Sequence, residues 1–172
     1  AKEVLRTLRT KPGLIVCCAA LIGGPISQSA YFLGSAMAGP AYALTITALY
    51  PIIGCILSSV FLKQAINSRM WFGIFLSVLG AIIVSYAPPE GDSTNFTLGL
   101  ICAGIAALGW GTEIVLATFG MSMVDPDIAI TLREMTSGLV LSLIVLPVVG
   151  GWSVVHSVVQ IPSALSFLVA AG

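Results

Sequence analysis

Glu113 is the single charged residue in a long apolar stretch from Ser93 to Val124. Small or aromatic residues share its side of the expected helix: Ala106, Gly109, Trp110, Ala117 and Gly120. Faces of small residues are where membrane helices approach one another or border a cavity. A carboxyl group there is costly unless it is paired, hydrated or protonated. The pattern predicts that Glu113 points into the protein and binds a proton or a substrate ammonium; the alternative is a carboxyl that only ties two helices together.

Arg133 and Glu134 lie in the next apolar stretch, about one and a half turns into a helix that begins near residue 128. Arg133 could extend to the lipid headgroups, as long basic side chains do near helix ends. Alternatively, it faces a central cavity, where it attracts an anionic group or pairs with Glu113. Adjacent helix residues point about 100° apart, so Arg133 and Glu134 are expected to have different partners. Glu113, Arg133 and Glu134 are the candidate residues for substrate or proton coupling.

The composition requires a membrane. Charged residues make up 8% of the chain and hydrophobic residues 58%, with a mean hydropathy of +1.06. Soluble domains carry roughly a quarter charged residues. The apolar stretches are too long and continuous for barrel strands, so we expect an all-α, polytopic helical membrane protein whose partner is the lipid bilayer. Seven basic and seven acidic residues cancel, which argues against a nucleic-acid partner.

The apolar stretches define the expected membrane spans, since a helix needs about 20 apolar residues to cross. Five complete spans are predicted, at residues 13–36, 40–62, 70–87, 97–122 and 128–149, and a sixth begins near residue 163. Because the chain begins without Met and ends within an apolar stretch, we interpret it as part of a longer protein.

The basic residues predict the orientation. They precede the first span and flank the loop between the second and third: Lys2, Arg6, Arg9, Lys11, Lys63 and Arg69. The connections 37–39 and 88–96 carry none. Basic loops stay in the cytoplasm. We therefore expect a protein of the cell membrane (plasma or inner) whose N-terminal side is cytoplasmic.

Two predicted spans contain helix-disrupting residues. Pro51 lacks an N–H and clashes with the carbonyl of Thr47, so the second span should kink there. Gly23, Gly24 and Pro25 interrupt the first span in a similar way. Discontinuous helices line the sites of many transporters, so these four residues are candidate hinges. The other candidates for lining a cavity are Gln28, Tyr31, Tyr42, Tyr50 and Trp110, of which Tyr31 is equally suited to anchoring at the membrane interface.

The segment "GGWSVVHSVVQIP" predicts an amphipathic helix in the outer membrane interface. Its polar residues recur at helical spacing: Ser153, His156, Ser157 and Gln160. His156 is therefore interpreted as a solvated residue and not as a ligand or a base. The four cysteines have neither zinc nor redox spacing and are expected to be packing residues, so no metal or cofactor is predicted.

Two stretches resemble the EamA-type transporters of the drug/metabolite transporter superfamily. The first, "GPAYALTITALYPIIGCILSSVFLKQAINSRMWFGIFLSVLGAIIVSY", resembles helices four and five, with a helical proline at Pro51, a short basic loop, and glycines at Gly73 and Gly80. The second, "LGLICAGIAALGWGTEIVLATFGMSMVDPDIAITLREMTSGL", resembles the opening of that family's second repeat, whose typical Trp and Arg correspond to Trp110 and Arg133. The family's usual Glu at the end of helix four is Gln64 here.

The resemblance implies an inverted five-helix-repeat transporter bundle, here incomplete and covering about helices three to eight of ten. Residues 1–87 would be the last three helices of the first repeat, 88–96 an extracytoplasmic linker, and 97–172 the first helices of the second repeat. The implied function is export or exchange of small metabolites such as amino acids or organic cations. Alternating access around a central cavity would be driven by protons or by substrate exchange, and a homodimer is left open.

Two other classes of function fit the sequence less well. A membrane-embedded protease needs paired acids or a Ser–His pair at depth, but Asp92, Asp125 and Asp127 fall in loops and His156 lies outside the spans. We therefore do not expect an enzyme. The stronger alternative is a non-transporting scaffold or assembly subunit, in which Glu113 would only join helices.

Overall fold

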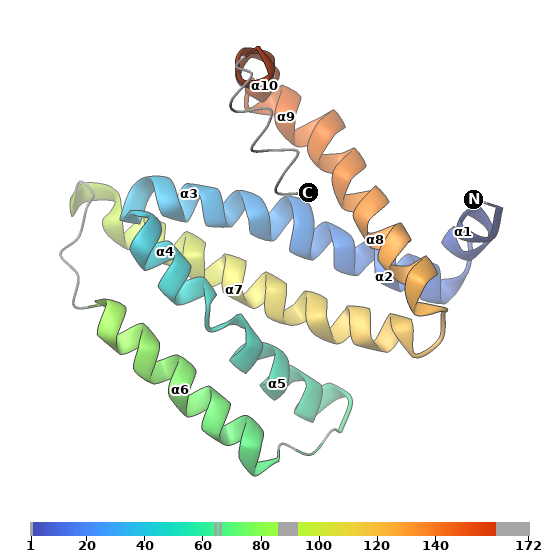
Figure 1. Cartoon of the computed structure of the whole chain (residues 1–172), viewed down its shortest axis with the longest axis horizontal. Coiled ribbons are helices and arrows are strands. Elements are labelled where there is room, and N and C mark those ends of the chain that lie inside the picture. Colours follow the sequence, from blue (N-terminus) through green and yellow to red (C-terminus); the bar gives the residue numbers. More distant parts are fainter. Residues whose placement is uncertain (1, 64, 66, 86–92, 161–172) are drawn as a thin grey trace. The chain divides into compact units, whose positions relative to one another are not determined.

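The computed structural model describes residues 2–63, 65, 67–85 and 93–160, and every regular element among them is a helix. The chain divides into two compact units, residues 1–137 and 138–172. The first unit contains α1 (Lys2–Leu8), α2 (Lys11–Leu21), the π-helix η1 (Ile22–Ser27), α3 (Gln28–Ala38), α4 (Pro40–Thr47), α5 (Tyr50–Phe61), α6 (Ser68–Ser85), α7 (Ser93–Met121) and most of α8 (Pro126–Val140) (Figure 1). The second contains the end of α8, the π-helix η2 (Leu141–Val145), α9 (Leu146–Val148) and α10 (Gly151–Val159).

Four helices are long and apolar enough to cross a membrane: Lys11–Ala38, Pro40–Phe61, Asn95–Met121 and Pro126–Val148. They confirm helices of spanning length at four of the predicted spans, 13–36, 40–62, 97–122 and 128–149. The predicted span 70–87 corresponds to α6, whose apolar part, Ser68–Ile83, is shorter than the other four. The span expected from residue 163 lies outside the described residues. The all-helical fold class is therefore confirmed.

The first unit is built around α7, which packs against α2, η1 and α3 on one side and against α4 and α5 on the other (Figure 1). Its buried side chains are mostly very small, among them Ala103, Ala106 and Ala107. A Cβ atom on Gly99 would lie only 2.6 Å from the backbone nitrogen of Ala38 in α3. Small residues therefore bring the backbones of α3 and α7 together, as is typical of membrane helices.

We expect Gly99→Ala to destabilise the fold by about 1–2 kcal/mol, because the added methyl group meets backbone that cannot move aside. Gly104→Ala is the matched control on the same helix, since nothing lies within 4 Å of the position of its Cβ. Thermal unfolding of the detergent-purified full-length protein measures both. An equal effect of the two substitutions would contradict the close approach at Gly99.

The kink predicted at Pro51 is confirmed. The second span divides into α4 and α5 at Ala48 and Leu49, and the two helices follow different directions in Figure 1. The Leu49 N–H donates to the Ile46 carbonyl at 3.1 Å, in a turn tighter than the α-helical ladder. The missing N–H of Pro51 accounts for the break.

The first span is not broken at Gly23, Gly24 and Pro25, contrary to the interruption predicted there. The helix runs on from Lys11 to Ala38, and the three residues lie inside the π-helix η1. A π-helical turn absorbs a helical proline by widening, so the chain keeps its direction while some carbonyls lose their α-helical partners. One of them, the Ile22 carbonyl, accepts a hydrogen bond from the Ser27 hydroxyl at 2.6 Å.

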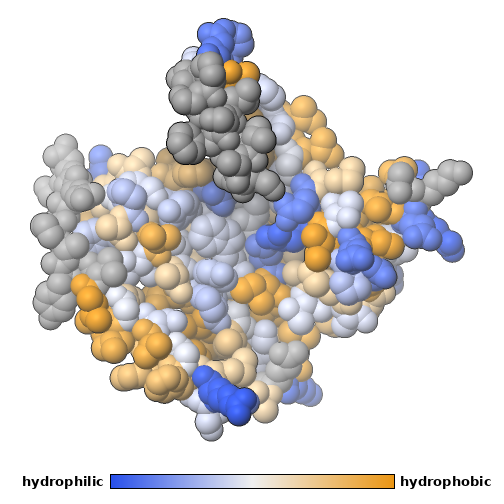
Figure 2. Space-filling view, viewed as in Figure 1, coloured by the Kyte–Doolittle hydropathy of each residue, from blue (hydrophilic) through white to orange (hydrophobic). Residues whose placement is uncertain are grey.

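The surface of the first unit is largely apolar. Large side chains of α6 are exposed, including Trp71, Phe72 and Phe75, and in Figure 2 apolar residues spread over this helix. Hydrophilic residues gather at α1 and at the start of α6, and further hydrophilic patches lie elsewhere on the same face (Figure 2). A largely apolar surface is what a protein in contact with lipid requires.

The second unit turns sharply after α9, where Gly150 adopts a left-handed conformation with φ of 66°. The predicted helix in "GGWSVVHSVVQIP" is confirmed as α10, and His156 is exposed there. Its ring nitrogen Nδ1 lies 3.4 Å from the side-chain nitrogen of Gln160. The position of α10 in the membrane interface stays a prediction.

Candidate functional site

Glu113 and Arg133 form an ion pair between α7 and α8. The Arg133 Nε–H donates to the Glu113 carboxylate at an Nε–Oε1 distance of 2.6 Å. The Glu113 side chain is 8% exposed and that of Arg133 is 39% exposed. The sequence predicted that Arg133 either extends to the lipid headgroups or faces a cavity, where it could pair with Glu113. The structure shows Arg133 paired with Glu113.

The pairing follows from the lengths of two successive helices. Glu113 lies eight residues before the end of α7 at Met121, and Arg133 lies seven residues after the start of α8 at Pro126. With a rise of about 1.5 Å per residue, each side chain is about 10–12 Å from the connecting turn. A short turn between two helices therefore brings both residues to the same depth.

Glu134 contacts Arg133, which corrects the expectation that these neighbours have different partners. The Arg133 Nη1–H donates to the Glu134 carboxylate at 2.5 Å. The two Cβ atoms do point apart, but the long side chains fold back toward each other. The guanidinium offers donors on more than one edge, so Arg133 binds both carboxylates at once.

The Glu113 carboxylate lies directly against the backbone of Gly23. A Cβ atom on Gly23 would overlap both the carboxyl carbon and Oε2 of Glu113. The neighbouring Gly24 faces α8 instead, where the Ser137 side chain occupies the corresponding space and donates to the Ala20 carbonyl at 2.9 Å. The two glycines thus bring η1 close to both α7 and α8.

Trp110, one turn before Glu113 on α7, also contacts this π-helix. Its indole N–H donates to the Gly23 carbonyl at 2.9 Å. The Trp110 ring lies between Tyr31 of α3 and Tyr50 of α5, with centroids 5.6 Å and 6.0 Å away. Three helices therefore meet in one row of aromatic rings, and the indole satisfies a carbonyl of η1.

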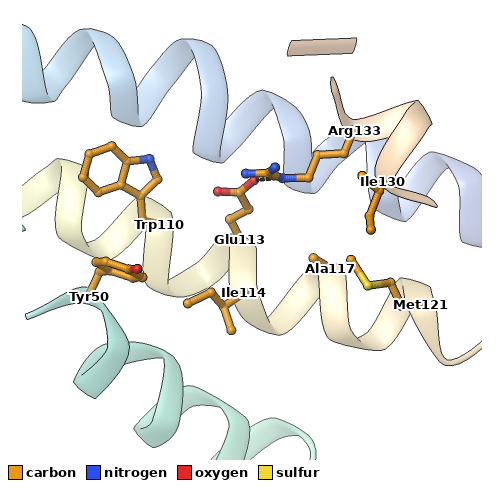
Figure 3. A pocket seen from close by; sticks show the side chains of 8 residues that line it. All are labelled: Tyr50, Trp110, Glu113, Ile114, Ala117, Met121, Ile130 and Arg133. Atoms are coloured by element: carbon orange, nitrogen blue, oxygen red, sulfur yellow. Dashed lines mark hydrogen bonds and ion pairs between the residues drawn. The ribbon is translucent and has the colours of Figure 1, made fainter. Parts of the chain in front are cut away.

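The ion pair faces a cavity of about 480 Å³ between α5, α7 and α8. Figure 3 shows Trp110 and Tyr50 facing each other at one end, with Glu113 reaching across to Arg133. The lining residues are Tyr50, Trp110, Glu113, Ile114, Ala117, Met121, Ile130 and Arg133.

The predicted cavity residues are therefore placed as follows. Tyr50 and Trp110 line the cavity, and Tyr31 reaches it only through its contact with Trp110. Gln28 is not among the lining residues, and Tyr42 packs edge-on against Phe96 with centroids 5.1 Å apart. Of the predicted hinges, Gly23 contacts Glu113 directly, whereas Pro51 follows the cavity residue Tyr50 in the chain.

Sequence reasoning missed three residues of the cavity wall: Ile114, which directly follows Glu113 in the chain, and Met121 and Ile130. Met121 lies eight residues after Glu113 on α7, and Ile130 three residues before Arg133 on α8. Both spacings keep a residue on the same face of a helix. A search along these two faces would have found Met121 and Ile130.

The charges of the site do not cancel. Two carboxylates share one guanidinium, which leaves one net negative charge when all three groups are ionised. Aromatic ring faces, such as those of Trp110 and Tyr50, attract positively charged groups. Among the residues that the structure describes, no three His, Cys, Asp or Glu side chains come together as metal ligands.

These features define a polytopic helical membrane protein with a buried ion pair beside a cavity. Residues 3–86 match the model of the EamA-like transporter family. The chain is also similar to Protein LicB of Haemophilus influenzae, with 31% identity over 101 residues. This alignment covers 59% of the chain and 34% of LicB, so the matched region spans about a third of the relative's length.

Proposed function

We propose that the full-length protein transports small metabolites, such as amino acids or organic cations, across the cell membrane by alternating access. The family domain supports a membrane transporter. The observation that carries the proposal is the buried Glu113, paired with Arg133 in the wall of a cavity of about 480 Å³. An ionisable group inside a membrane bundle typically marks a substrate or ion pathway.

In this proposal the Glu113 carboxylate is the group that binds a proton or a substrate ammonium. Trp110 and Tyr50 would hold the organic part of a cationic substrate against their ring faces. The break before Pro51 and the π-helix η1 would act as hinges, because both lie next to cavity residues and leave the regular α-helical ladder.

The wider architecture belongs to the same proposal. Residues 97–172 would begin the second, inverted repeat, and the family match, which ends at residue 86, is compatible with a boundary there. The basic residues that begin the chain and flank the loop after α5 would lie in the cytoplasm. Export as the direction of transport and a homodimer remain predictions.

Counterflow into proteoliposomes of the full-length protein tests the function. A panel of labelled amino acids and organic cations, tetramethylammonium among them, would be compared for wild type and Glu113→Gln. We expect wild type to move at least one probe and Glu113→Gln to reduce that flux at least about tenfold, because a neutral amide cannot form an ion pair with a cation. Glu3→Gln, which neutralises an exposed carboxylate of α1, is the matched control.

The outcomes separate transport from the scaffold alternative. If wild type and Glu113→Gln move a probe equally well, the protein is a transporter in which Glu113 serves packing. If no probe moves and Glu113→Gln alters only assembly, the chain belongs to a scaffold subunit and the proposal fails.

A further inference from the structure

We propose that Arg133 is a tethered counter-cation for the transport site. Its guanidinium would occupy Glu113 when the cavity is empty and withdraw to Glu134 when a cationic substrate arrives. This inference rests on the proposed function and specifies how that site is regulated. The guanidinium of Arg133 competes with a cationic substrate for the Glu113 carboxylate.

The geometry places the guanidinium between two carboxylates of different exposure. Arg133 reaches Glu113 through Nε at 2.6 Å and Glu134 through Nη1 at 2.5 Å. The exposed fraction of the side chain rises from 8% in Glu113 to 39% in Arg133 and 64% in Glu134. A small rotation of the Arg133 side chain would therefore transfer it from a buried partner to an exposed one.

Burial requires that the Glu113 carboxyl be either paired with a cation or protonated in every state of the protein. The carboxylate is enclosed by the backbone of Gly23 and by the small residues of α7, and an unpaired charge there is strongly disfavoured. The two ion pairs found within the described part of the chain both use Arg133. Arg133 is thus the partner that keeps Glu113 paired when no substrate is present.

Glu134 makes the withdrawal of Arg133 reversible. If Arg133 left Glu113 with no other partner, its guanidinium would lose an ion pair when the substrate gained one. With Glu134 in contact, the guanidinium keeps an ion pair in both the empty and the loaded site. The protein can then change conformation with the site empty as well as with the site loaded. It should therefore carry out net transport of a cation, and not only exchange one cation for another.

Net efflux and exchange of labelled tetramethylammonium, measured in the same proteoliposomes, test this mechanism. Arg133→Gln removes the internal competitor, so we expect a lower half-saturating concentration and retained exchange. Net efflux should fall at least about tenfold, because the empty site now holds an unpaired carboxylate. Arg133→Lys keeps a cation and should preserve net efflux.

Glu134→Gln should change affinity in the opposite direction. Arg133 then has Glu113 as its remaining carboxylate partner, so the half-saturating concentration should rise, by about three- to tenfold. Asp127→Asn is the matched control, because it neutralises an exposed carboxylate in the first turn of the same helix. A purely structural role for the cluster would lower activity in both Arg133→Gln and Glu134→Gln without opposite shifts in affinity.

The results that overturn the inference differ from those that overturn the proposed function. If Arg133→Gln lowers exchange and net efflux by the same factor, or if Glu134→Gln leaves affinity unchanged, Arg133 is not a counter-cation although transport stands. If Arg133→Gln does not fold, equal affinity of Glu134→Gln and wild type still overturns the inference. If wild type moves no cation, both the inference and the cation-transport function fail.

Discussion

Gly23→Ala is expected to reduce transport at least about tenfold while leaving the fold intact. The added methyl group would occupy the space that now holds the Glu113 carboxylate. That carboxylate is the far end of a flexible side chain, so it will move while the helix backbones stay in place. Once displaced, it can no longer meet the Arg133 Nε, which now lies 2.6 Å from Oε1. The damage is therefore to the site and not to the packing of the helices.

Counterflow and thermal unfolding of the full-length variant distinguish these two effects. Gly24→Ala is the closest control, because its methyl group meets the Ser137 side chain and not Glu113. We expect it to lose the hydrogen bond from Ser137 to Ala20 and to retain most of its transport. If Gly23→Ala transports like wild type, the Glu113 carboxylate has a second productive position and its contact with Gly23 is not needed.

Arg133→Gln is expected to lower the free energy of unfolding by about 2–3 kcal/mol at mildly alkaline pH. Removing one partner of a buried ion pair leaves the other charge uncompensated, which costs about 3–5 kcal/mol in a fully buried pair. The cost is smaller here because the Arg133 side chain is 39% exposed, which allows partial solvation of the site. Glu113→Gln should cost less, since Arg133 keeps its contact with Glu134.

A double-mutant cycle checks this assignment. If the ion pair is responsible, the variant with both Glu113→Gln and Arg133→Gln will be more stable than Arg133→Gln alone, with a coupling of about 1–2 kcal/mol. Denaturation of the four purified proteins at one pH supplies the values. Additive effects of the two substitutions would show that Glu113 and Arg133 do not interact in solution.

The membrane spans were predictable because their cause is local. Each span needs a run of about 20 apolar residues, and that run can be read from the sequence without knowing what it packs against. The kink before Pro51 was predictable for the same reason, since a missing N–H acts on the helix that contains it. The burial of Glu113 was also foreseen, because small residues repeat on its side of α7.

The interruption of the first span shows where local reasoning fails. Gly23, Gly24 and Pro25 predicted a break, but a π-helical turn keeps the helix continuous. The turn is stabilised in part by Trp110, which lies 87 residues away and donates to the Gly23 carbonyl. Whether a carbonyl that has lost its α-helical partner finds such a donor depends on a distant helix. The local sequence therefore does not decide between a broken helix and a π-helical turn.

The sequence by itself determined the class of protein, four of its spans, the burial of Glu113 and the candidate charges, because composition and helical periodicity are properties of the chain alone. Only the tertiary structure decided how those charges are connected. The packing of η1 on α7 sets Gly23 against the Glu113 carboxylate, and the α7–α8 hairpin brings Arg133 to the same depth. The contact between Arg133 and Glu134 depends on side-chain conformation, which no spacing rule specifies.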